Sequence, residues 1–418
     1  MEKGNEIKIA IPALRFPEFQ DTEGWKEYIL GDFLLEQPRY GINAPAVPFL
    51  EELPTYIRIT DISENGCFLP NPKVSVNHGA INDFYLNIGD LVFARTGASV
   101  GKCYKYKEKD GKLVFAGFLI KVSPDQTRLS SDFLFQFTFT QQYWKWIDLT
   151  SIRSGQPGIN SKELASMELY LPVKDEQQKI ADCLSSLDDL IEATAQKVRA
   201  LEKHKKGLMQ RLFPAEGKNV PDLRFPEFQG MKGWEKKQIK DFGEVITGNT
   251  PSKKEEKYWN GDFVWVTAQD FKGKYINDSI LKLTKFGKDK ARVIPKDSVL
   301  VTCIASIGLN AINKVECSTN QQINAICCNQ EYNYEYVYYL VTYNTENLKQ
   351  LAGQTAVPII TKKSFEEFEV YTIENYDEQQ KIADCLSSLD ELIETTSRKV
   401  EILKEHKKGL MQQLFPKI

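Results

Sequence analysis

The sequence has few histidines, no close pair of cysteines and no long apolar run. Three histidines among 418 residues leave few carriers for acid-base or metal chemistry. The eight cysteines form no C-x-x-C motif, so a zinc site or redox centre is not indicated and buried free thiols are the simpler interpretation. No segment approaches the roughly 18 apolar residues of a membrane span, and the first residues show no export signal. We therefore expect a cytoplasmic protein without a membrane partner.

An excess of one charge is also missing. The chain has 54 Lys+Arg and 57 Asp+Glu, a formal charge of -3. Glycine and proline are at ordinary levels and 11% of the residues are aromatic, which excludes a collagen-like or largely disordered chain. The length fits a globular protein of roughly two to four domains.

Several motifs that carry chemistry are absent. The sequence contains no N-P-P-[YF] motif of amino-methyltransferases, no G-x-G-x-x-G cofactor loop and no H-E-x-x-H metal motif. The segment Gly97 to Cys103 (GASVGKC) resembles a phosphate loop, but it is one residue too short between its glycines and has Cys103 where Ser or Thr would reach magnesium. A glycine-rich turn after a strand explains it better.

One further segment resembles a nuclease motif. Pro221-Asp222 followed by Glu235-x-Lys237 has the spacing of the P-D, E-x-K carboxylate set of metal-dependent nucleases. A similar segment begins at Pro12, and there the position aligned with Asp222 is Ala13, which is not an acid. A solvated surface run is the better interpretation. We therefore predict no catalytic residue, no metal site, no cofactor bound by this chain and no enzymatic activity of its own.

The chain is an internal duplication. Residues 175–214 and 377–416 align without gaps and differ at nine of 40 positions, so that 31 are identical. A second repeated motif stands at the start of each half. It reads PALRFPEFQ at Pro12 to Gln20 and PDLRFPEFQ at Pro221 to Gln229, and a Gly-Trp pair follows it in both halves. The order is therefore LRFPEF motif, variable region and 40-residue repeat, twice.

Each 40-residue repeat has the pattern of a long amphipathic helix. Residues at alternating steps of four and three form the seam of a heptad repeat, and they are apolar except for Thr194 and Lys205 in the first repeat and Thr396 and Lys407 in the second. Acidic residues at the start and basic residues near the end suit the helix dipole. Neither seam is stable in water alone, so we expect the two helices to form a coiled coil. The pattern does not fix their direction, but a pseudo-two-fold axis between the halves would make them antiparallel, and we expect this arrangement. The predicted seam residues are Ile180, Leu184, Leu187, Ile191, Val198, Leu201, Leu208, Ile382, Leu386, Leu389, Ile393, Val400, Leu403 and Leu410.

The variable regions have the pattern of two α+β domains. Runs rich in β-branched and aromatic residues predict strands at 55–62, 90–94, 113–122, 263–267, 298–304 and 323–328. Helices are predicted at 131–148 and 334–351. We therefore expect an α+β fold with two globular domains separated by the two long helices. The predicted ranges are 1–174 for the first domain, 175–214 for the central helix, 215–376 for the second domain and 377–418 for the last helix.

Charge is organised locally within the two variable regions. Leu91 to Lys121 has seven Lys+Arg against two acids, and Phe271 to Lys296 has eight against two. Either stretch could be a solvated face, but their presence in both regions favours contact with phosphate. Base recognition needs mixed donors and acceptors. The candidate DNA-binding residues are Arg58, Thr60, Arg95, Thr96, Ser99, Lys102, Lys105, Gln156 and Asn160 in the first region, and Thr267, Gln269, Lys272, Lys285, Lys288, Lys290, Arg292, Ser306, Asn320, Gln321, Gln322 and Gln354 in the second.

Over essentially its whole length the chain resembles the specificity (S) subunit of type I restriction-modification systems. The resemblance rests on GDLVFARTGASVGKCY (89–104), GINSKELASMELYLPVKDEQQKIA (158–181), STNQQINAI (318–326), both DEQQKIADCLSSLD segments and both HKKGLMQ[RQ]LFP helix ends. It implies two target-recognition domains, each recognising one half of an interrupted, asymmetric site in double-stranded DNA, held apart by the coiled coil.

The same resemblance implies partner subunits. Two methyltransferase (M) subunits would carry the S-adenosylmethionine chemistry, and restriction (R) subunits would carry ATP- and magnesium-dependent translocation and cleavage. Two other interpretations remain at this point. One is a DNA-processing enzyme with its own active site, which the missing motifs disfavour, and the other is a coiled-coil scaffold that binds proteins.

Overall fold

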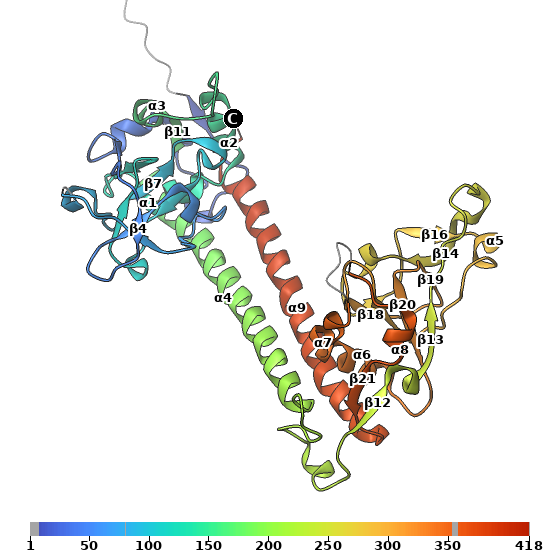
Figure 1. The fold of residues 1–418 in the computed structure, drawn as a ribbon. Coiled ribbons are helices and arrows are strands. Elements are labelled where there is room, and N and C mark those ends of the chain that lie inside the picture. The colour runs from blue at the N-terminus through green and yellow to red at the C-terminus, as the bar shows by residue number, and fades with distance from the viewer. Residues whose placement is uncertain (1–7, 80, 353–357, 418) are drawn as a thin grey trace, which may run out of the picture. The chain divides into compact units, whose positions relative to one another are not determined.

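The computed structural model describes residues 8–79, 81–352 and 358–417 (Figure 1). The chain divides into two compact units. The first unit comprises Met1–Ala195 and Arg398–Ile418, and the second comprises Gln196–Ser397. Among the described residues, none of the helices has the length and apolar character needed to cross a bilayer.

Two long helices contribute to both units. Helix α4 spans Lys174–Leu212 and helix α9 spans Tyr376–Leu414. Their heptad pattern favours helix throughout, and the Phe-Pro pair after each last turn ends it because proline cannot continue the hydrogen-bond ladder. The first unit contains the start of α4 and the end of α9, and the second contains the start of α9 and the end of α4.

Within each unit the two helix segments run antiparallel, as predicted. In the first unit Asp188 of α4 is hydrogen bonded to Lys407 of α9. Earlier residues of α4 share a core with later residues of α9, namely Ile180, Ala181 and Leu184 with Met411 and Leu414. The second unit repeats this relation, with Lys205 bonded to Asp390 and Met209 and Leu212 sharing a core with Ile382, Ala383 and Leu386.

The structure places the predicted seam residues on the covered face of the helices. The fully buried ones lie where a helix meets the globular part of its unit or the opposite helix: Ile180, Leu184, Ile382, Leu386 and Val400. The others are half-buried: Leu187, Ile191, Val198, Leu201, Leu208, Leu389, Ile393, Leu403 and Leu410.

The globular part of the first unit is built from short strands and helices. One sheet has the order β1 (Ile9–Ala10), β2 (Trp25–Ile29), β11 (Glu168–Leu171). A second has the order β3 (Arg39–Tyr40), β10 (Leu119–Val122), β7 (Leu91–Ala94), β8 (Cys103–Lys105), and a third β4 (Val47–Pro48), β6 (Val74–Ser75), β5 (Thr55–Ile57), β9 (Leu113–Phe115). The helices are α1 (Ser131–Phe137), α2 (Gln141–Thr150) and α3 (Ser161–Ala165).

The second unit has the same kind of architecture. Its largest sheet has the order β13 (Gly243–Thr247), β20 (Ile323–Cys328), β17 (Val299–Thr302), β18 (Asn310–Asn313), β15 (Tyr275–Ile276). The other strands pair as β16 (Leu281–Leu283), β14 (Trp259–Val266), β19 (Ser318–Thr319) and as β12 (Glu235–Gln238) with β21 (Glu369–Thr372). The helices are α5 (Lys285–Lys288), α6 (Tyr334–Tyr343), α7 (Thr345–Gln350) and α8 (Lys362–Glu366).

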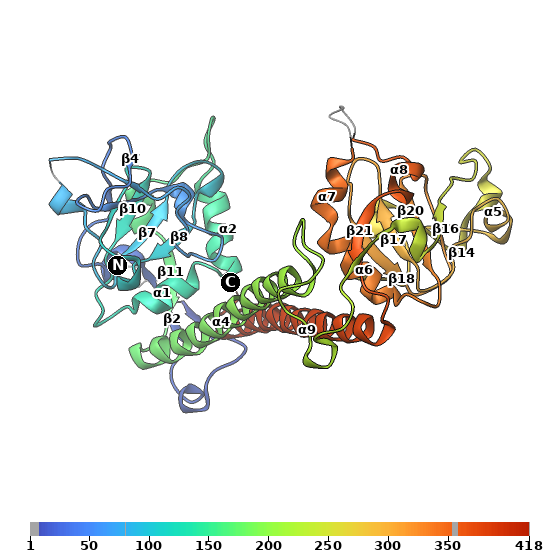
Figure 2. The ribbon, with the colours of Figure 1, turned by 60° about the horizontal axis from the view of Figure 1, so that its bottom comes forward.

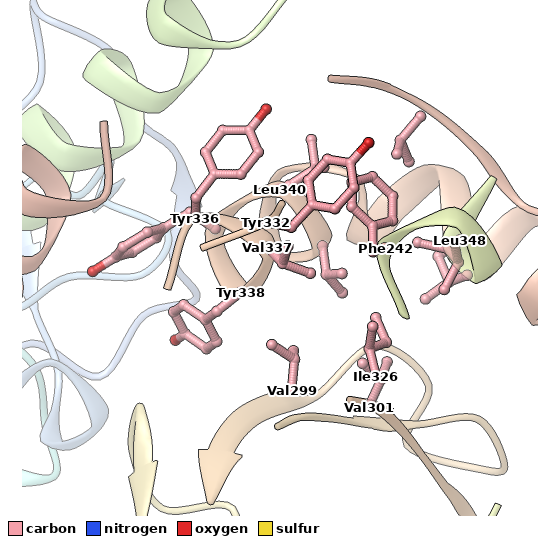
Figure 3. Close-up of a cluster of buried hydrophobic side chains, with 14 of the residues drawn as sticks. Phe242, Val299, Val301, Ile326, Tyr332, Tyr336, Val337, Tyr338, Leu340 and Leu348 are labelled. Carbon is pink, nitrogen blue, oxygen red and sulfur yellow. The ribbon is translucent and has the colours of Figure 1, made fainter. Parts of the chain in front are cut away.

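Helix α6 covers one face of the largest sheet in the second unit (Figure 2). Its Tyr336, Val337 and Leu340 share a core cluster with valines of β17 and Ile326 of β20 (Figure 3). Asn310 of β18 donates to the carbonyl of Tyr338 at 3.1 Å, which connects the helix to the sheet. The sheet is thus supported on this face by α6.

The LRFPEF motif joins the globular part to the helices in both units. Arg15 Nε lies 2.9 Å from Glu176 Oε1 in a buried ion pair, and Arg224 Nε lies 2.7 Å from Glu378 Oε1 in the second unit. The hydrogen bond that Arg15 donates to the Glu176 carboxylate raises the pKa of Arg15. The backbone of the motif also contacts the opposite helix end, since Leu14 N donates to Gln413 O at 2.9 Å.

Some predicted elements differ from those in the structure. The strand expected at 113–122 is two strands interrupted at residues 116–118, and the one expected at 55–62 ends at Ile57. The helix expected at 131–148 is two helices because Thr140 caps the start of α2. The eight cysteines are free, as expected, but only Cys103, Cys303 and Cys317 are buried, while four others are partly buried and Cys67 is exposed.

Candidate nucleic-acid interface

The same tight turn follows a strand in each unit. Strand β5 ends at Ile57 and a 3-10 turn covers Ile59–Asp61, while β14 ends at Val266 and a 3-10 turn covers Ala268–Asp270. Each strand has a parallel neighbour, with Ile57 opposite Phe115 and Val266 opposite Thr319. Arg58 and Thr267 therefore occupy equivalent positions at the start of the turn.

An aspartate organises each turn. Asp61 Oδ2 accepts from the Arg58 backbone N at 2.8 Å, and Asp270 Oδ2 accepts from the Thr267 backbone N at 2.7 Å. Both aspartates are almost fully buried. The backbone groups that the strand no longer satisfies are satisfied by these carboxylates, so each turn is held in one conformation.

A second loop lies beside each turn. It covers residues 116–118 after β9 in the first unit and residues 320–322 after β19 in the second. Arg95 N donates to Phe118 O at 3.0 Å, and Cys303 N donates to Gln322 O at 2.7 Å. The loops after β7 and β17 therefore join the same edge, and these loops contain the predicted Thr96 and Ser99 in the first unit and Ser306 in the second.

In the second unit the strand-end turn and the loop at residues 320–322 line a cavity of about 460 Å³ that is open to solvent. The predicted Thr267, Gln269, Asn320, Gln321 and Gln322 all line it. The structure therefore brings together five residues that the sequence predicts for base recognition from their donor and acceptor groups alone. The remaining lining residues are Thr250, Lys253, Trp265, Ala268, Ile280 and Leu281.

In the first unit an arginine occupies the corresponding edge. The guanidinium carbon of Arg95 lies 4.4 Å from the centre of the Tyr40 ring, and its Nε is buried without a hydrogen-bond partner among the described residues. Tyr40 is itself fixed, because its hydroxyl accepts from the backbone N of Ser161 at 3.0 Å. Stacking on an aromatic ring holds the planar guanidinium in place for paired acceptors.

The other predicted residues of the first unit have partners or are exposed. Arg58 makes two hydrogen bonds to Asp61, at 2.9 and 2.8 Å, and Asn160 caps α3 by accepting from the backbone N of Glu163. Thr60 and Gln156 are exposed. The amide of Gln156 lies over Gly97, where φ is +71° and a β-carbon would come within 2.5 Å of Gln156 Nε2.

Several lysines of the basic stretches form ion pairs. Lys102 lies 2.6 Å from Glu64, Lys105 pairs with Asp132, and Lys288 pairs with Glu316. Such partly exposed pairs contribute little to stability, so they can exchange for phosphate at low cost. The structure leaves Lys272, Lys285 and Lys290 exposed, and Arg292 exposed with one hydrogen bond to the carbonyl of Thr247. Gln354 lies outside the described residues.

Sequence reasoning missed the apolar and aromatic members of these sites. Tyr40, Ile280 and Leu281 were not predicted, because polar character was the only criterion and an exposed aliphatic residue is common on any protein. Lys253 was also missed, since it precedes the basic stretch. The sequence carries no local signal for Ile280, because its exposed fraction of 62% depends on the tertiary structure.

The described residues contain no group of three or more histidine, cysteine or acidic residues that could hold a metal ion. Gly97 to Gly101 fits the G-x-S-x-G pattern of a nucleophile elbow, but that motif requires a strand-turn-helix. Here the segment is a 3-10 turn between the antiparallel strands β7 and β8.

Comparison with known proteins gives a consistent result. The family model for the type I restriction modification DNA specificity domain matches residues 49–203 and again residues 231–405, together more than half of the chain. Each match begins in a globular part and continues into the long helix that follows it. The duplication inferred from the repeats therefore corresponds to two copies of this domain.

Individual relatives carry the same description. The type I restriction enzyme MjaIX specificity subunit of Methanocaldococcus jannaschii is 36% identical over 191 residues, which is 44% of each chain. The HindI specificity subunit of Haemophilus influenzae is 25% identical over 423 residues, covering 83% of this chain and 89% of that one. The crystal structure of the type I S subunit from M. genitalium covers 98% of this chain and 100% of its own with a TM-score of 0.65 and 15% identity, which shows a common fold.

Proposed function

The chain belongs to the type I restriction modification DNA specificity family, and we propose that it recognises a bipartite DNA sequence, one part with each unit. Half-sites of different sequence would make the whole site asymmetric. The family match gives no support to the alternatives of a DNA-processing enzyme or a general protein-binding scaffold. We also propose that the chain has no catalytic activity of its own.

The observation that best supports this proposal is the equivalence of the two strand-end turns. The same backbone geometry presents Arg58 in one unit and Thr267 in the other, and the neighbouring loop presents residues 116–118 in one and Asn320 to Gln322 in the other. A common frame with different side chains is what two recognition surfaces for different base sequences require.

We propose that the long helices bind the catalytic partners. The 40-residue repeats offer the same surface twice, with Leu190 and Leu392 exposed at equivalent positions. Two identical M subunits would suit two such surfaces. S-adenosylmethionine would then be bound by the M subunits, and ATP and magnesium by R subunits.

Purified chain, alone and with its M subunit, tests this proposal on a pool of random DNA duplexes. The expected result is retention of duplexes that share two short sequences at fixed spacing, followed by their methylation when the M subunit and S-adenosylmethionine are present. Retention without sequence preference, or methylation by the chain alone, would contradict it.

A further inference from the structure

The cavity of the second unit combines hydrogen-bond donors with an apolar wall. The donors come from Gln321 and Gln322, and the wall comes from Ile280 and Leu281, which are 62% and 38% exposed. Contact with phosphate alone would not need this apolar area, because phosphate recognition depends on positive charge. Lys253 is the cation among the lining residues.

Hydrogen bonds within the cavity orient the two amides. The hydroxyl of Thr250 donates to Gln321 Oε1 at 2.6 Å, and Asn320 Nδ2 donates to Gln322 Oε1 at 3.3 Å. Each of these amide oxygens thereby accepts one hydrogen bond. The amide nitrogens Nε2 of Gln321 and Gln322 have no hydrogen-bond partner in the part of the chain that the structure describes, so these two donors are available to an acceptor on a ligand.

Asp270 fixes the apolar wall relative to the turn. Its Oδ2 accepts from the backbone N of Thr267 at 2.7 Å, and its Oδ1 accepts from the backbone N of Ile280 at 2.9 Å. One buried carboxylate thus holds both sides of the cavity. A ligand that fits both the donors and the wall therefore meets a preorganised site, and little ordering entropy is lost on binding.

The geometry points to an A·T base pair as the ligand, with thymine against the wall, and this inference rests on the proposed function. In the major groove thymine presents one acceptor, O4, beside its C5-methyl group, and adenine presents N7 and N6. An amide donor can contact O4 while Ile280 and Leu281 cover the methyl group. A G·C pair offers acceptors too, but it has no methyl group for the wall.

The corresponding loop of the first unit, residues 116–118, lacks this combination. Its residues equivalent to Asn320, Gln321 and Gln322 are Ala116, Gly117 and Phe118, which carry no side-chain donor. We therefore expect this recognition of thymine, with an amide donor at O4 and the apolar wall at the methyl group, only in the half-site that the second unit binds.

Replacing thymine by deoxyuridine tests the inference, because uracil keeps O4 and lacks only the methyl group. The chain is assembled with its M subunits on its mapped DNA site, and each thymine of both half-sites is replaced in turn. At one position of the second half-site we expect binding to weaken about fourfold, the equivalent of about 0.8 kcal/mol for one buried methyl group. Equal binding of thymine and uracil at every position of that half-site would overturn the inference, as would a half-site without an A·T pair.

Two variants connect the effect to the cavity. Leu281→Ala should bind the thymine and uracil duplexes almost equally, whereas Leu309→Ala, which removes an exposed leucine outside the cavity, should keep the fourfold difference. Gln321→Met should relax the preference for the A·T pair, and Gln330→Met, at an exposed glutamine outside the cavity, should not. If Leu309→Ala also abolished the difference, the wall would not be its source.

The outcomes separate this inference from the function on which it rests. If the wild-type complex binds its site selectively but ignores the methyl group, only the A·T inference fails. If the wild-type complex shows no sequence preference on unmodified DNA, the proposed function fails.

Discussion

The Nζ of Lys407 on α9 lies 2.7 Å from both carboxylate oxygens of Asp188 on α4. The equivalent pair in the second unit is Lys205 and Asp390. Both lysines occupy polar positions of the otherwise largely apolar seam. A polar residue in a coiled-coil seam selects one register and orientation at some cost in stability. The two pairs therefore fix which residues of the opposite helix each seam meets.

The first prediction concerns this polar layer. Lys407→Ala should lower the free energy of unfolding by about 0.5–1 kcal/mol, a modest loss because Asp188 is 41% exposed and solvent screens the pair. Thermal unfolding measures the change. Lys404→Ala is the matched control, since Lys404 contacts Glu401 of its own helix. Equal changes in the free energy of unfolding for the two variants would contradict a specific contribution of the pair between Lys407 and Asp188.

The second prediction concerns the buried ion pair between Arg224 and Glu378, whose side chains are 9% and 1% exposed. Glu378→Ala should cost about 3–5 kcal/mol, because it leaves a buried guanidinium without its partner. The double variant Arg224→Met with Glu378→Leu should recover most of this loss, since replacing a whole buried pair by apolar residues is often neutral. Denaturant unfolding of the three proteins checks both statements. A double variant as unstable as Glu378→Ala would contradict the explanation.

The third prediction is a pH dependence at Glu335 on α6. Burial opposes its ionisation, but hydrogen bonds from Lys274, Tyr275 and Ser387 outweigh burial and hold the pKa of Glu335 below its usual 4.5. The folded state therefore binds this proton less readily than the unfolded state, so the carboxylate stabilises the fold above pH 4.5 and this stabilisation is lost as the pH falls through the folded pKa.

Glu335→Gln makes this pH dependence measurable. The difference in melting temperature between wild type and variant should be largest near neutral pH and should shrink as the pH drops below about 4.5. Glu346→Gln, at an exposed residue of α7, should show no such trend. A difference for Glu335→Gln that stays constant across this range would contradict the pKa argument.

The fourth prediction follows from the contribution of each helix to both units. In the first unit Phe415 packs on Trp25 at 5.8 Å between ring centres, and in the second Phe213 packs on Trp234 at 5.6 Å. Residues 8–214 include the whole of α4. The start of α4 packs in the first unit, and the end of α4 has nearly the same sequence as the end of α9, which also packs there. Two copies of this fragment can therefore complete each other, and we expect a homodimer.

Light scattering of the purified fragment gives its mass. Phe213→Asp should yield a monomer, because a charge at this buried position cannot enter the partner's core. Gln210→Asp, at an exposed helix position, should remain a dimer. A monomeric unsubstituted fragment at every concentration would contradict this prediction.

The repeated and periodic features of the fold could be predicted from the sequence, because they are local. The seam from Ile180 to Leu208 follows from its heptad spacing, and β20 has the predicted bounds of 323–328. The break after Phe115 could not be predicted, because the surrounding residues are uniformly apolar and hide the turn at Gly117. Secondary structure can thus be predicted from a local sequence pattern where a single hydrophobic periodicity dominates the segment.

The polar residues of the candidate site could be predicted from the sequence, but the contacts between them could not. Gln269 and Gln321 are far apart in sequence, but the side-chain chemistry of each predicts a role in base recognition, and the structure places both in one cavity. That Lys102 meets Glu64 depends on how two loops fold together. Contacts of this kind are set by tertiary structure, and the sequence carries no local signal for them.

The most direct test of two independent recognition surfaces is a map of methylated bases in the DNA of a host that carries this chain and its M subunit. The map is compared with that from a chain in which residues 230–376 are replaced by the same region of another family member. We predict that one half of the methylated sequence changes while the other half and the spacing stay the same. A replacement that altered both halves, or neither, would contradict the account.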